Sequence, residues 1–365
     1  MKKNIFITGG AGYVGAMLVD QLVRREDVAL IITVDKEEKS DLLEKLKLEN
    51  PGLAKKIIYI QDNLANSTWQ NQVSQYQIDV VIHTAWQIRA MYGKKGYATT
   101  WHWNIDGSNN VFDLVFPNQN KIPRLIYFST VASYGAFPEN SRHHFFKEEE
   151  PFRISEYIYA EEKKAAEENL QRKFIAAMDT AGSYENIPEV VILRPAAISG
   201  PRGRYERIRF GLQANLQGKI KGGFLFSIIK LLTTFVPATS KWVRQFIHED
   251  DVVNIVTLLA FQEKLLNKYD VFNISPPGNC VFPSDMARAV QKKILWIWPC
   301  MVRLVFTFFW HISRGRIPTC PGSWRGYSYP IVVDGSKLTK KYNFNYKYSS
   351  HEAFTNNAGV YKVEL

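Results

Sequence analysis

The chain has 365 residues, enough to bury a sizeable core as one large domain or as two lobes. Its 46% apolar and 22% charged residues exclude a disordered chain and are typical of a folded globular protein. The net charge of +11 is concentrated in residues 201–247 and 291–330, but no nucleic-acid-binding motif accompanies it, so we expect no nucleic-acid partner.

The first 195 residues alternate short apolar segments with segments of helical character. The apolar segments are rich in Ile and Val on both faces, which is typical of strands covered by helices on both sides. We predict strands at 4–8, 30–34, 56–60, 79–83, 124–129 and 189–194, and helices at 13–25, 40–49, 100–116 and 156–178. This alternation predicts an α/β fold with a doubly wound parallel sheet.

The first strand leads into a glycine-rich turn, TGGAGYVG (8–15), directly before the first helix. Because Gly9, Gly12 and Gly15 lack side chains, the backbone can approach a pyrophosphate, and the amino end of the helix favours an anion. A plain turn between a strand and a helix could use the same glycines. The choice between the two therefore depends on residues further along the chain.

Two carboxylates follow the next two strands. Asp35 ends the second strand, where a carboxylate can accept hydrogen bonds from the adenosine ribose. A carboxylate there repels a 2′-phosphate, so NAD is predicted in preference to NADP. Asp62 follows the third strand, where it could accept a hydrogen bond from the adenine amino group. Together with the glycine turn, these residues predict a dinucleotide site.

A tyrosine and a lysine share one face of the helix predicted at 156–178. Tyr159 and Lys163 are four residues apart, whereas the residue four after Tyr157 is Glu161. A free tyrosine has a pKa of about 10, and a neighbouring ammonium would lower that pKa. Thr130 follows the fifth strand, at the sheet edge where ligands bind, and could orient a substrate hydroxyl or carbonyl towards Tyr159.

The alternation of strands and helices is lost after Pro195. We predict that residues 1–195 form a dinucleotide-binding domain, completed by roughly 246–275. Residues 196–245 and 276–365 are predicted to form a substrate-binding lobe with apolar, basic segments.

Several segments form a specific set between residue 4 and about residue 275. They are TGGAGYVG, Asp35, Asp62, HTA (83–85), NIDGSNNV with Asn104, STVASYG, Tyr159 with Lys163, LRPAAISGP (193–201) and FIHEDDVV (246–253). With this set the chain resembles an extended short-chain dehydrogenase/reductase of the NAD-dependent epimerase/dehydratase family, which includes 3β-hydroxysteroid dehydrogenase-like relatives. The resemblance implies a Rossmann-type sheet with a smaller C-terminal substrate lobe, and NAD as cofactor.

The resemblance also implies roles for single residues. Tyr159 would be the catalytic acid/base, Lys163 would hold the nicotinamide ribose and lower the pKa of Tyr159, and Thr130 would be the third catalytic residue. Contacts to the cofactor are implied or predicted for Gly9, Gly12, Tyr13, Val14, Gly15, Asp35, Asp62, Asn63, His83, Ala85, Asn104, Tyr159, Lys163 and Pro195. Substrate contacts are predicted at Arg204, Arg325 and Tyr327, and no metal site is predicted.

The reaction implied is hydride transfer at a secondary alcohol or ketone. Sugar-nucleotide 4,6-dehydratases of this family carry an Asp-Glu pair directly after the catalytic threonine, whereas Val131 and Ala132 follow Thr130 here. Our main interpretation is a sugar-nucleotide epimerase or related dehydrogenase. The first alternative is a hydroxysteroid- or lipid-alcohol dehydrogenase at the membrane surface, and the second is a non-catalytic dinucleotide-binding module.

Two apolar stretches with basic flanks, 224–237 and 294–312, leave the cellular setting open. The second is close to the roughly 20 residues that span a bilayer, but Pro299 and Arg303 interrupt it. It is interpreted as a buried core helix, as an interfacial segment resting on lipid or, least favoured, as a span. The three cysteines form no close pair, which favours a reduced, cytoplasmic compartment. We expect a small-molecule substrate; peripheral membrane contact and a homodimer stay open.

Overall fold

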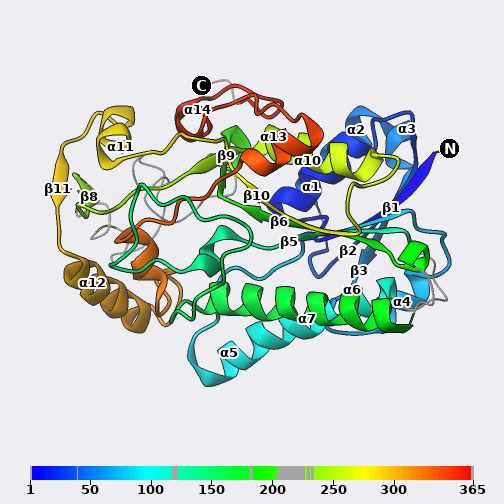
Figure 1. Ribbon diagram of the computed structural model, residues 1–365, viewed down its shortest axis with the longest axis horizontal. Coiled ribbons are helices and arrows are strands. Elements are labelled where there is room, and N and C mark those ends of the chain that lie inside the picture. Colours follow the sequence, from blue (N-terminus) through cyan, green and yellow to red (C-terminus); the bar gives the residue numbers. More distant parts are fainter. Residues whose placement is uncertain are drawn as a thin grey trace.

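A parallel sheet of seven strands forms the centre of the molecule (Figure 1). The computed structural model describes residues 2–38, 40–116, 122–180, 184–203, 227, 231 and 234–362. The strands are β1 (Lys3–Thr8), β2 (Val28–Asp35), β3 (Ile57–Gln61), β4 (Val80–His83), β5 (Arg124–Phe128), β6 (Glu189–Pro195) and β10 (Tyr269–Ile274). They are ordered β10-β6-β5-β4-β1-β2-β3. The predicted doubly wound α/β fold is confirmed.

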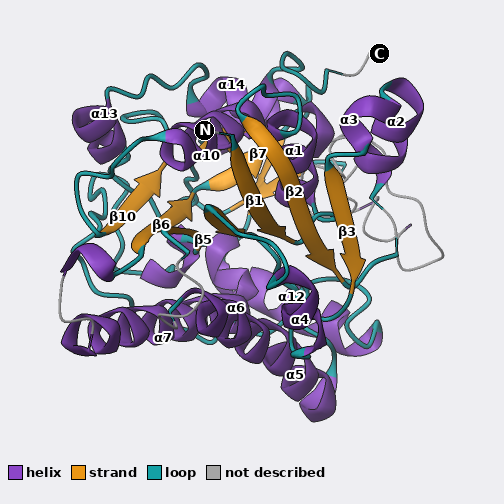
Figure 2. Cartoon of the chain, turned by 90° about the vertical axis from the view of Figure 1, so that its right-hand side faces the viewer, coloured by secondary structure: helices purple, strands orange, loops and turns teal. Residues whose placement is uncertain are grey.

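Helices cover both faces of the sheet (Figure 2). On one face lie α1 (Tyr13–Leu22), α2 (Asp41–Glu49), α3 (Pro51–Ala54), α10 (Glu249–Phe261) and α13 (Ser336–Tyr342). On the other lie α4 (Thr68–Val73), α5 (Gly93–Trp101), α6 (Gly107–Val115) and α7 (Ile158–Thr180). Successive residues of β1 alternate between the two layers: Ile5 and Ile7 pack in the core that includes α1 and α10, and Phe6 packs in the opposite core.

The smaller C-terminal lobe lies beyond one end of the sheet (Figure 1). Its described elements are β8 (Val236–Ala238), α11 (Pro283–Ala289), β11 (Ile294–Trp296), α12 (Pro299–Ile312), the 3₁₀ turn η5 (Ser323–Tyr327) and α14 (Ser350–Thr355). Strand β11 pairs with β8, and β7 (Ala197–Ser199) pairs with β9 (Phe246–His248) between the sheet and the lobe. Two further 3₁₀ turns are η2 (Val131–Tyr134) and η3 (Tyr184–Asn186).

The apolar stretch 294–312 does not form one element. It is divided into β11 and α12, and Pro299 is the first residue of α12, where its missing N–H costs no hydrogen bond. Within the described ranges, we find no helix with both the length and the apolar character needed to cross a bilayer. Most of the other apolar stretch, 224–237, and Arg204 lie outside the described residues.

The last part of the chain returns to the sheet. Lys337 and Lys341 of α13 hold Asp270 of β10, with Nζ to carboxylate distances of 2.9 and 2.6 Å. Further on, the Tyr361 hydroxyl donates to the carboxylate of Asp20 in α1 at 2.8 Å. Helix α13 and Tyr361 therefore pack on the layer that contains α1 and α10.

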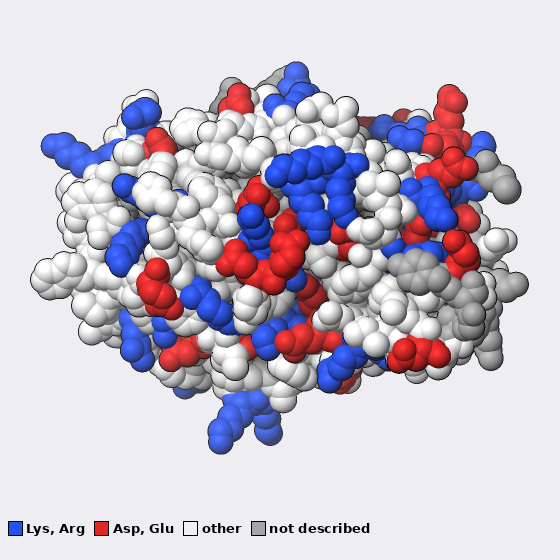
Figure 3. All heavy atoms as spheres, in the orientation of Figure 1, with Lys and Arg blue, Asp and Glu red and all other residues white. Residues whose placement is uncertain are grey.

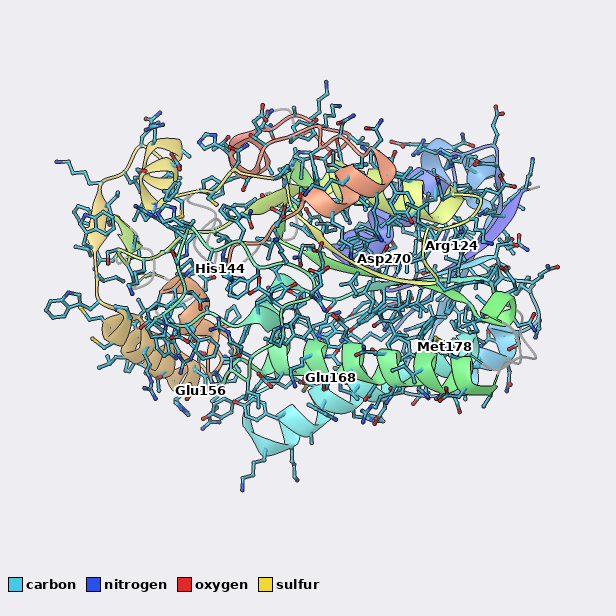
Figure 4. The ribbon with its side chains drawn as sticks, in the orientation of Figure 1. Arg124, His144, Glu156, Glu168, Met178 and Asp270 are labelled. Atoms are coloured by element: carbon cyan, nitrogen blue, oxygen red, sulfur yellow. The ribbon has the colours of Figure 1, made fainter. Side chains whose placement is uncertain are left out.

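Buried ion pairs close the amino-terminal edge of the sheet. The guanidinium of Arg124, at the start of β5, pairs with the Glu189 carboxylate of β6 at 2.5 Å and donates to carbonyls at the end of α10. Figure 4 shows Arg124 and Asp270 near one another, far from Glu156, which precedes α7 at the end facing the C-terminal lobe. The carboxyl-terminal edge is thus the one that faces the lobe and can receive a ligand.

Candidate active site

A cavity of about 960 Å³ lies along the carboxyl-terminal edge of the sheet and is lined by residues of both lobes. It begins at the glycine turn after β1, passes the ends of β2, β4, β5 and β6, and reaches η5 and the segment around Ile331. Ligand pockets of roughly 300–1,000 Å³ hold small molecules and cofactors. The volume is therefore ample for a ligand that spans both lobes.

The glycine turn is shaped by close approaches that leave no space for side chains. Gly9 has a φ of +79°, and a Cβ there would lie 2.8 Å from the Ala85 Cα in the loop after β4. A Cβ on Gly15 would lie 2.1 Å from the Gly9 carbonyl oxygen. Gly12 caps the amino end of α1, and it lines the cavity with Tyr13 and Val14. The turn therefore presents bare backbone and a helix amino end to the cavity, the arrangement that binds phosphate.

The predicted adenosine contacts also lie along the cavity. Asp35 accepts hydrogen bonds from the backbone N–H groups of Ala11, at 2.9 Å, and Glu37, at 3.0 Å. A carboxylate has about four acceptor positions, so acceptor capacity is left for a ligand. Lys36, beside it, lies with its ammonium 4.5 Å from the centroid of the Trp103 ring.

Asp62 and Asn63 form the wall beyond Asp35. Burial raises the pKa of Asp62, but hydrogen bonds from Thr68, at 2.5 Å, and Asn66, at 3.0 Å, outweigh it and the pKa is lowered. Asn63 accepts a hydrogen bond from the Ala65 backbone at 3.0 Å. Both side chains are thus oriented by the turn after β3.

His83 lines the cavity, but both nitrogens of its ring are hydrogen-bonded to protein side chains. The Thr8 hydroxyl accepts from the N–H groups of Thr84 and Ala85, so it donates to Nδ1 of His83, at 2.7 Å. The Ser108 hydroxyl donates to a carbonyl, so it accepts from Nε2 of His83 at 2.9 Å. Burial, with a smaller contribution from Lys163, lowers the pKa of His83 to about 3. The imidazole is therefore neutral and fixes the loop after β4.

Thr130 and Tyr159 meet at the centre of the cavity wall. Both residues line the cavity, and Thr130 accepts a hydrogen bond from the Ala132 N–H at 3.1 Å. Burial raises the pKa of Tyr159, and its interaction with the Thr130 side chain opposes this rise. The Ser133 hydroxyl donates to the Ala160 carbonyl at 3.1 Å, which leaves Thr130 as the hydroxyl beside Tyr159.

Lys163 is buried on the same helix, and its Nζ lies between a backbone carbonyl and an indole ring. Nζ donates to the Phe128 carbonyl at 2.5 Å and lies 3.6 Å from the centroid of the Trp86 ring. Burial lowers the pKa of Lys163 well below its usual value, although Glu167 and Glu162 oppose this. The expected lowering of the Tyr159 pKa by Lys163 stays a prediction.

Asn104 lies in a one-turn π-helix, η1 (His102–Asp106), that joins α5 to α6. The single helix predicted at 100–116 is thus interrupted. The Asn104 amide accepts from the Gln87 N–H at 2.7 Å and donates to Glu162, also at 2.7 Å. It therefore connects the loop after β4 to the helix that carries Tyr159 and Lys163.

The lobe end of the cavity is lined by different residues from those predicted. Pro195 lines it as expected, but Arg325 and Tyr327 only flank the lining residue Gly326. The Arg325 guanidinium lies 4.0 Å from the Glu156 carboxylate and packs on Trp324. Among the described residues, no cluster of three or more His, Cys, Asp or Glu could hold a metal ion.

Arg244 and Trp86 are among the lining residues that sequence reasoning missed. Arg244 donates to the Gly326 carbonyl at 2.9 Å and stacks near the Tyr327 ring, so it brings a cation to the lobe end. Trp86 covers the Lys163 ammonium. The signal that could have found them is their place in the sequence, beside two segments of the family resemblance. Trp86 directly follows HTA (83–85), and Arg244 stands two residues before FIHEDDVV (246–253).

Comparisons with known proteins agree with this geometry. The model of the NAD dependent epimerase/dehydratase family matches residues 5–275. An epimerase family protein of Staphylococcus aureus (strain bovine RF122 / ET3-1) is 22% identical over 290 residues, 80% of this chain and 81% of the relative. A UDP-N-acetyl-alpha-D-glucosaminuronate decarboxylase of Bacillus cytotoxicus is 29% identical over 135 residues, 37% of this chain and 39% of the relative.

Solved structures share the fold along nearly the whole chain. A UDP-glucose 4-epimerase with UDP-glucose from Thermotoga maritima has a TM-score of 0.65 at 20% identity, covering 96% of each chain. A UDP-glucuronic acid 4-epimerase from Bacillus cereus, in complex with UDP-glucuronic acid and NAD, has a TM-score of 0.65 at 17% identity and the same coverage. A dTDP-glucose 4,6-dehydratase from Bacillus anthracis with NAD has a TM-score of 0.66 at 16% identity, covering 97% of this chain and 94% of that one.

Proposed function

This chain belongs to the NAD dependent epimerase/dehydratase family, and we propose that it is an NAD-dependent epimerase of a sugar nucleotide, acting at a secondary alcohol. The observation that carries the proposal is the cavity itself. It joins the glycine turn, the Thr130–Tyr159 pair and the Arg244 guanidinium in one space. A dinucleotide at one end and an anionic substrate at the other would meet at Tyr159.

The described residues fit a nicotinamide dinucleotide. The bare glycine turn and the amino end of α1 would hold the pyrophosphate, and Asp35 and Asp62 would bind the adenosine. Asp35 supports NAD over NADP because its carboxylate repels a 2′-phosphate, and Lys36 is engaged with Trp103 instead of facing such a group. We expect tighter binding of NAD than of NADP, which titration of the protein with each dinucleotide would test.

When bound, NAD supplies an acceptor for the hydride of the substrate alcohol and can return it. The chain's part is proton transfer and positioning. The Tyr159 hydroxyl would exchange the alcohol proton, and the Thr130 hydroxyl would hold the reacting oxygen beside it. Because burial raises the Tyr159 pKa, the phenol is protonated in the free protein and is ready to donate.

Epimerisation is favoured over dehydration by the residues after Thr130. Elimination of water requires a group that protonates the departing hydroxyl. Val131 and Ala132 line the cavity at this place and supply no proton. Arg244, at the lobe end, supports a substrate with a diphosphate because a guanidinium pairs well with phosphate oxygens.

The test is turnover of UDP-sugars by the protein with NAD. We expect an epimeric product without accumulation of NADH. In the variant Tyr159→Phe we expect turnover to fall by about 10²–10⁴-fold with NAD affinity unchanged. The control is Tyr127→Phe, since the Tyr127 hydroxyl is buried without a hydrogen-bond partner among the described residues and lies outside the cavity wall. If Tyr159→Phe turned over normally, a non-catalytic binding module would be the better description.

A lipid-alcohol or hydroxysteroid dehydrogenase is the second candidate. The observation in its favour is that α12, whose outer face is apolar, packs on η5 beside the lobe end of the cavity: the Phe306 and Tyr327 rings lie 5.1 Å apart. A dehydrogenase would accumulate NADH with a prenol or a hydroxysteroid. An epimerase would not.

A further inference from the structure

The outer face of the C-terminal lobe carries a row of large apolar side chains. We define the α12 surface as Trp296, Trp298, Met301, Leu304, Phe308 and Ile312, all exposed. Trp298 is 75% exposed and Leu304 69%. The four helical members are spaced by three or four residues, so they share one face of α12. Soluble surfaces rarely place so many large apolar groups together without a partner.

The inner face of α12 already completes the fold. Val302, Phe309 and Trp310 are buried, and Trp310 packs with Ala90 and Cys320 in a small core. Besides Arg303, the side chains of Thr307 and His311 are exposed polar groups of α12. The helix thus has apolar residues on both sides. Its exposed apolar row does not contribute to the packing of the lobe.

Exposed basic residues flank the α12 surface along the chain. From residue 286 to residue 333 the sequence has seven Lys/Arg and no Asp or Glu. Arg288, Lys293, Arg303, Arg314 and Arg316 are exposed. Within the described part of the chain, Lys293, Arg303, Arg314 and Arg316 have no carboxylate at ion-pair distance, whereas Arg325 lies beside Glu156. Figure 3 shows this end of the molecule mostly white, with more blue than red.

We propose that the α12 surface docks onto an anionic lipid bilayer. The apolar row would enter the boundary between headgroups and acyl chains, and the cations around it would meet the phosphates. Tryptophans favour this boundary because they have an apolar body and one N–H donor, and two of them, Trp296 and Trp298, border the helix. A second protein copy would place these cations against each other, so charge favours lipid over a homodimer.

Vesicle flotation tests the proposal with the full chain. We expect binding to phosphatidylcholine vesicles that contain phosphatidylglycerol, at least tenfold weaker binding to phosphatidylcholine alone, and weakening at high salt. The double variant Leu304→Ser/Phe308→Ser should bind at least tenfold more weakly. The control is Leu48→Ser on α2, because Leu48 is 85% exposed and lies on the other lobe. NAD affinity, measured in parallel, should be unchanged in all variants and shows that they fold.

Two results would overturn the proposal. One is equal binding of the wild type and the double variant to anionic vesicles. The other is a concentration-dependent dimer that the double variant abolishes while no form of the protein floats with vesicles. In that case the α12 surface would be a contact between two copies of the chain. Neither result depends on which substrate is turned over.

Discussion

At the scale of single residues, buried polar groups that are hydrogen-bonded within the protein organise the site. His83 is the central example. Its ring is held between Thr8 and Ser108, and through the Thr8 hydroxyl it fixes the N–H groups of Thr84 and Ala85. Ala85 in turn lies against Gly9. The histidine therefore helps to hold the loop after β4 against the glycine turn.

We predict a specific pH dependence of stability from His83. Its folded pKa of about 3 lies below the usual 6.5, so protons bind preferentially to the unfolded chain and stability is lost as the pH falls below about 6.5. Between pH 7.5 and pH 5 this amounts to about 2 kcal/mol. Urea unfolding of the wild type and His83→Gln at both pH values measures it, since the variant lacks this contribution. Equal changes in the two proteins would contradict the assignment.

At the scale of elements, two irregular backbone segments position the site. The glycine turn brings α1 to the cavity, and the π-turn η1 directs Asn104 between the loop after β4 and α7. Both are local departures from regular structure, a positive φ at Gly9 and a π-turn between two α-helices.

The variant Gly15→Ala tests the glycine turn. The new methyl group would lie 2.1 Å from the Gly9 carbonyl oxygen, so the turn must move away from its phosphate-binding shape. We expect NAD affinity to fall at least about tenfold, or 1.4 kcal/mol, as measured by calorimetry. The matched control is Gly52→Ala in α3, where the nearest atom would be 3.5 Å away. If both variants bound NAD like the wild type, the turn would not be the pyrophosphate site.

At the scale of the whole molecule, the C-terminal segment joins the lobes. It leaves the C-terminal lobe at α14, and its Val360 N–H donates to Asp250 of α10 at 3.0 Å. The Tyr361 hydroxyl then reaches Asp20 of α1, the helix that follows the glycine turn. The helix layer that contains α1 and α10 is thus completed by residues distant in sequence.

Removal of that hydroxyl tests the contribution of the segment. Because Asp20 is 7% exposed, Tyr361→Phe removes a hydrogen bond from a nearly buried carboxylate. We expect the free energy of unfolding to fall by about 1–2 kcal/mol, measured by chemical denaturation. Val360→Ala should change it by less than about 0.5 kcal/mol, since Val360 is 57% exposed. A loss of the same size in both variants would mean that the hydroxyl bond is not the cause.

The sequence by itself determined the fold class and the family. Strand and helix periodicity is local, so the six strands predicted in the first 195 residues appear as β1 to β6, and the glycine turn, Asp35 and Tyr159 lie along one cavity. The roles assigned to these residues stay predictions until the variants are measured. Periodicity also failed locally: Pro299 divides 294–312, and η1 divides the helix predicted at 100–116.

Only the tertiary structure decided which side chains meet. Lys163 is four residues from Tyr159, but its ammonium is held by the Phe128 carbonyl and covered by Trp86, groups from two different strand ends. Arg244, not Arg325, lines the lobe end of the cavity. Side-chain direction depends on packing between distant segments, and exposure of the α12 row depends on what the rest of the fold leaves uncovered. Local sequence patterns therefore predict neither the direction of a side chain nor the exposure of the α12 row.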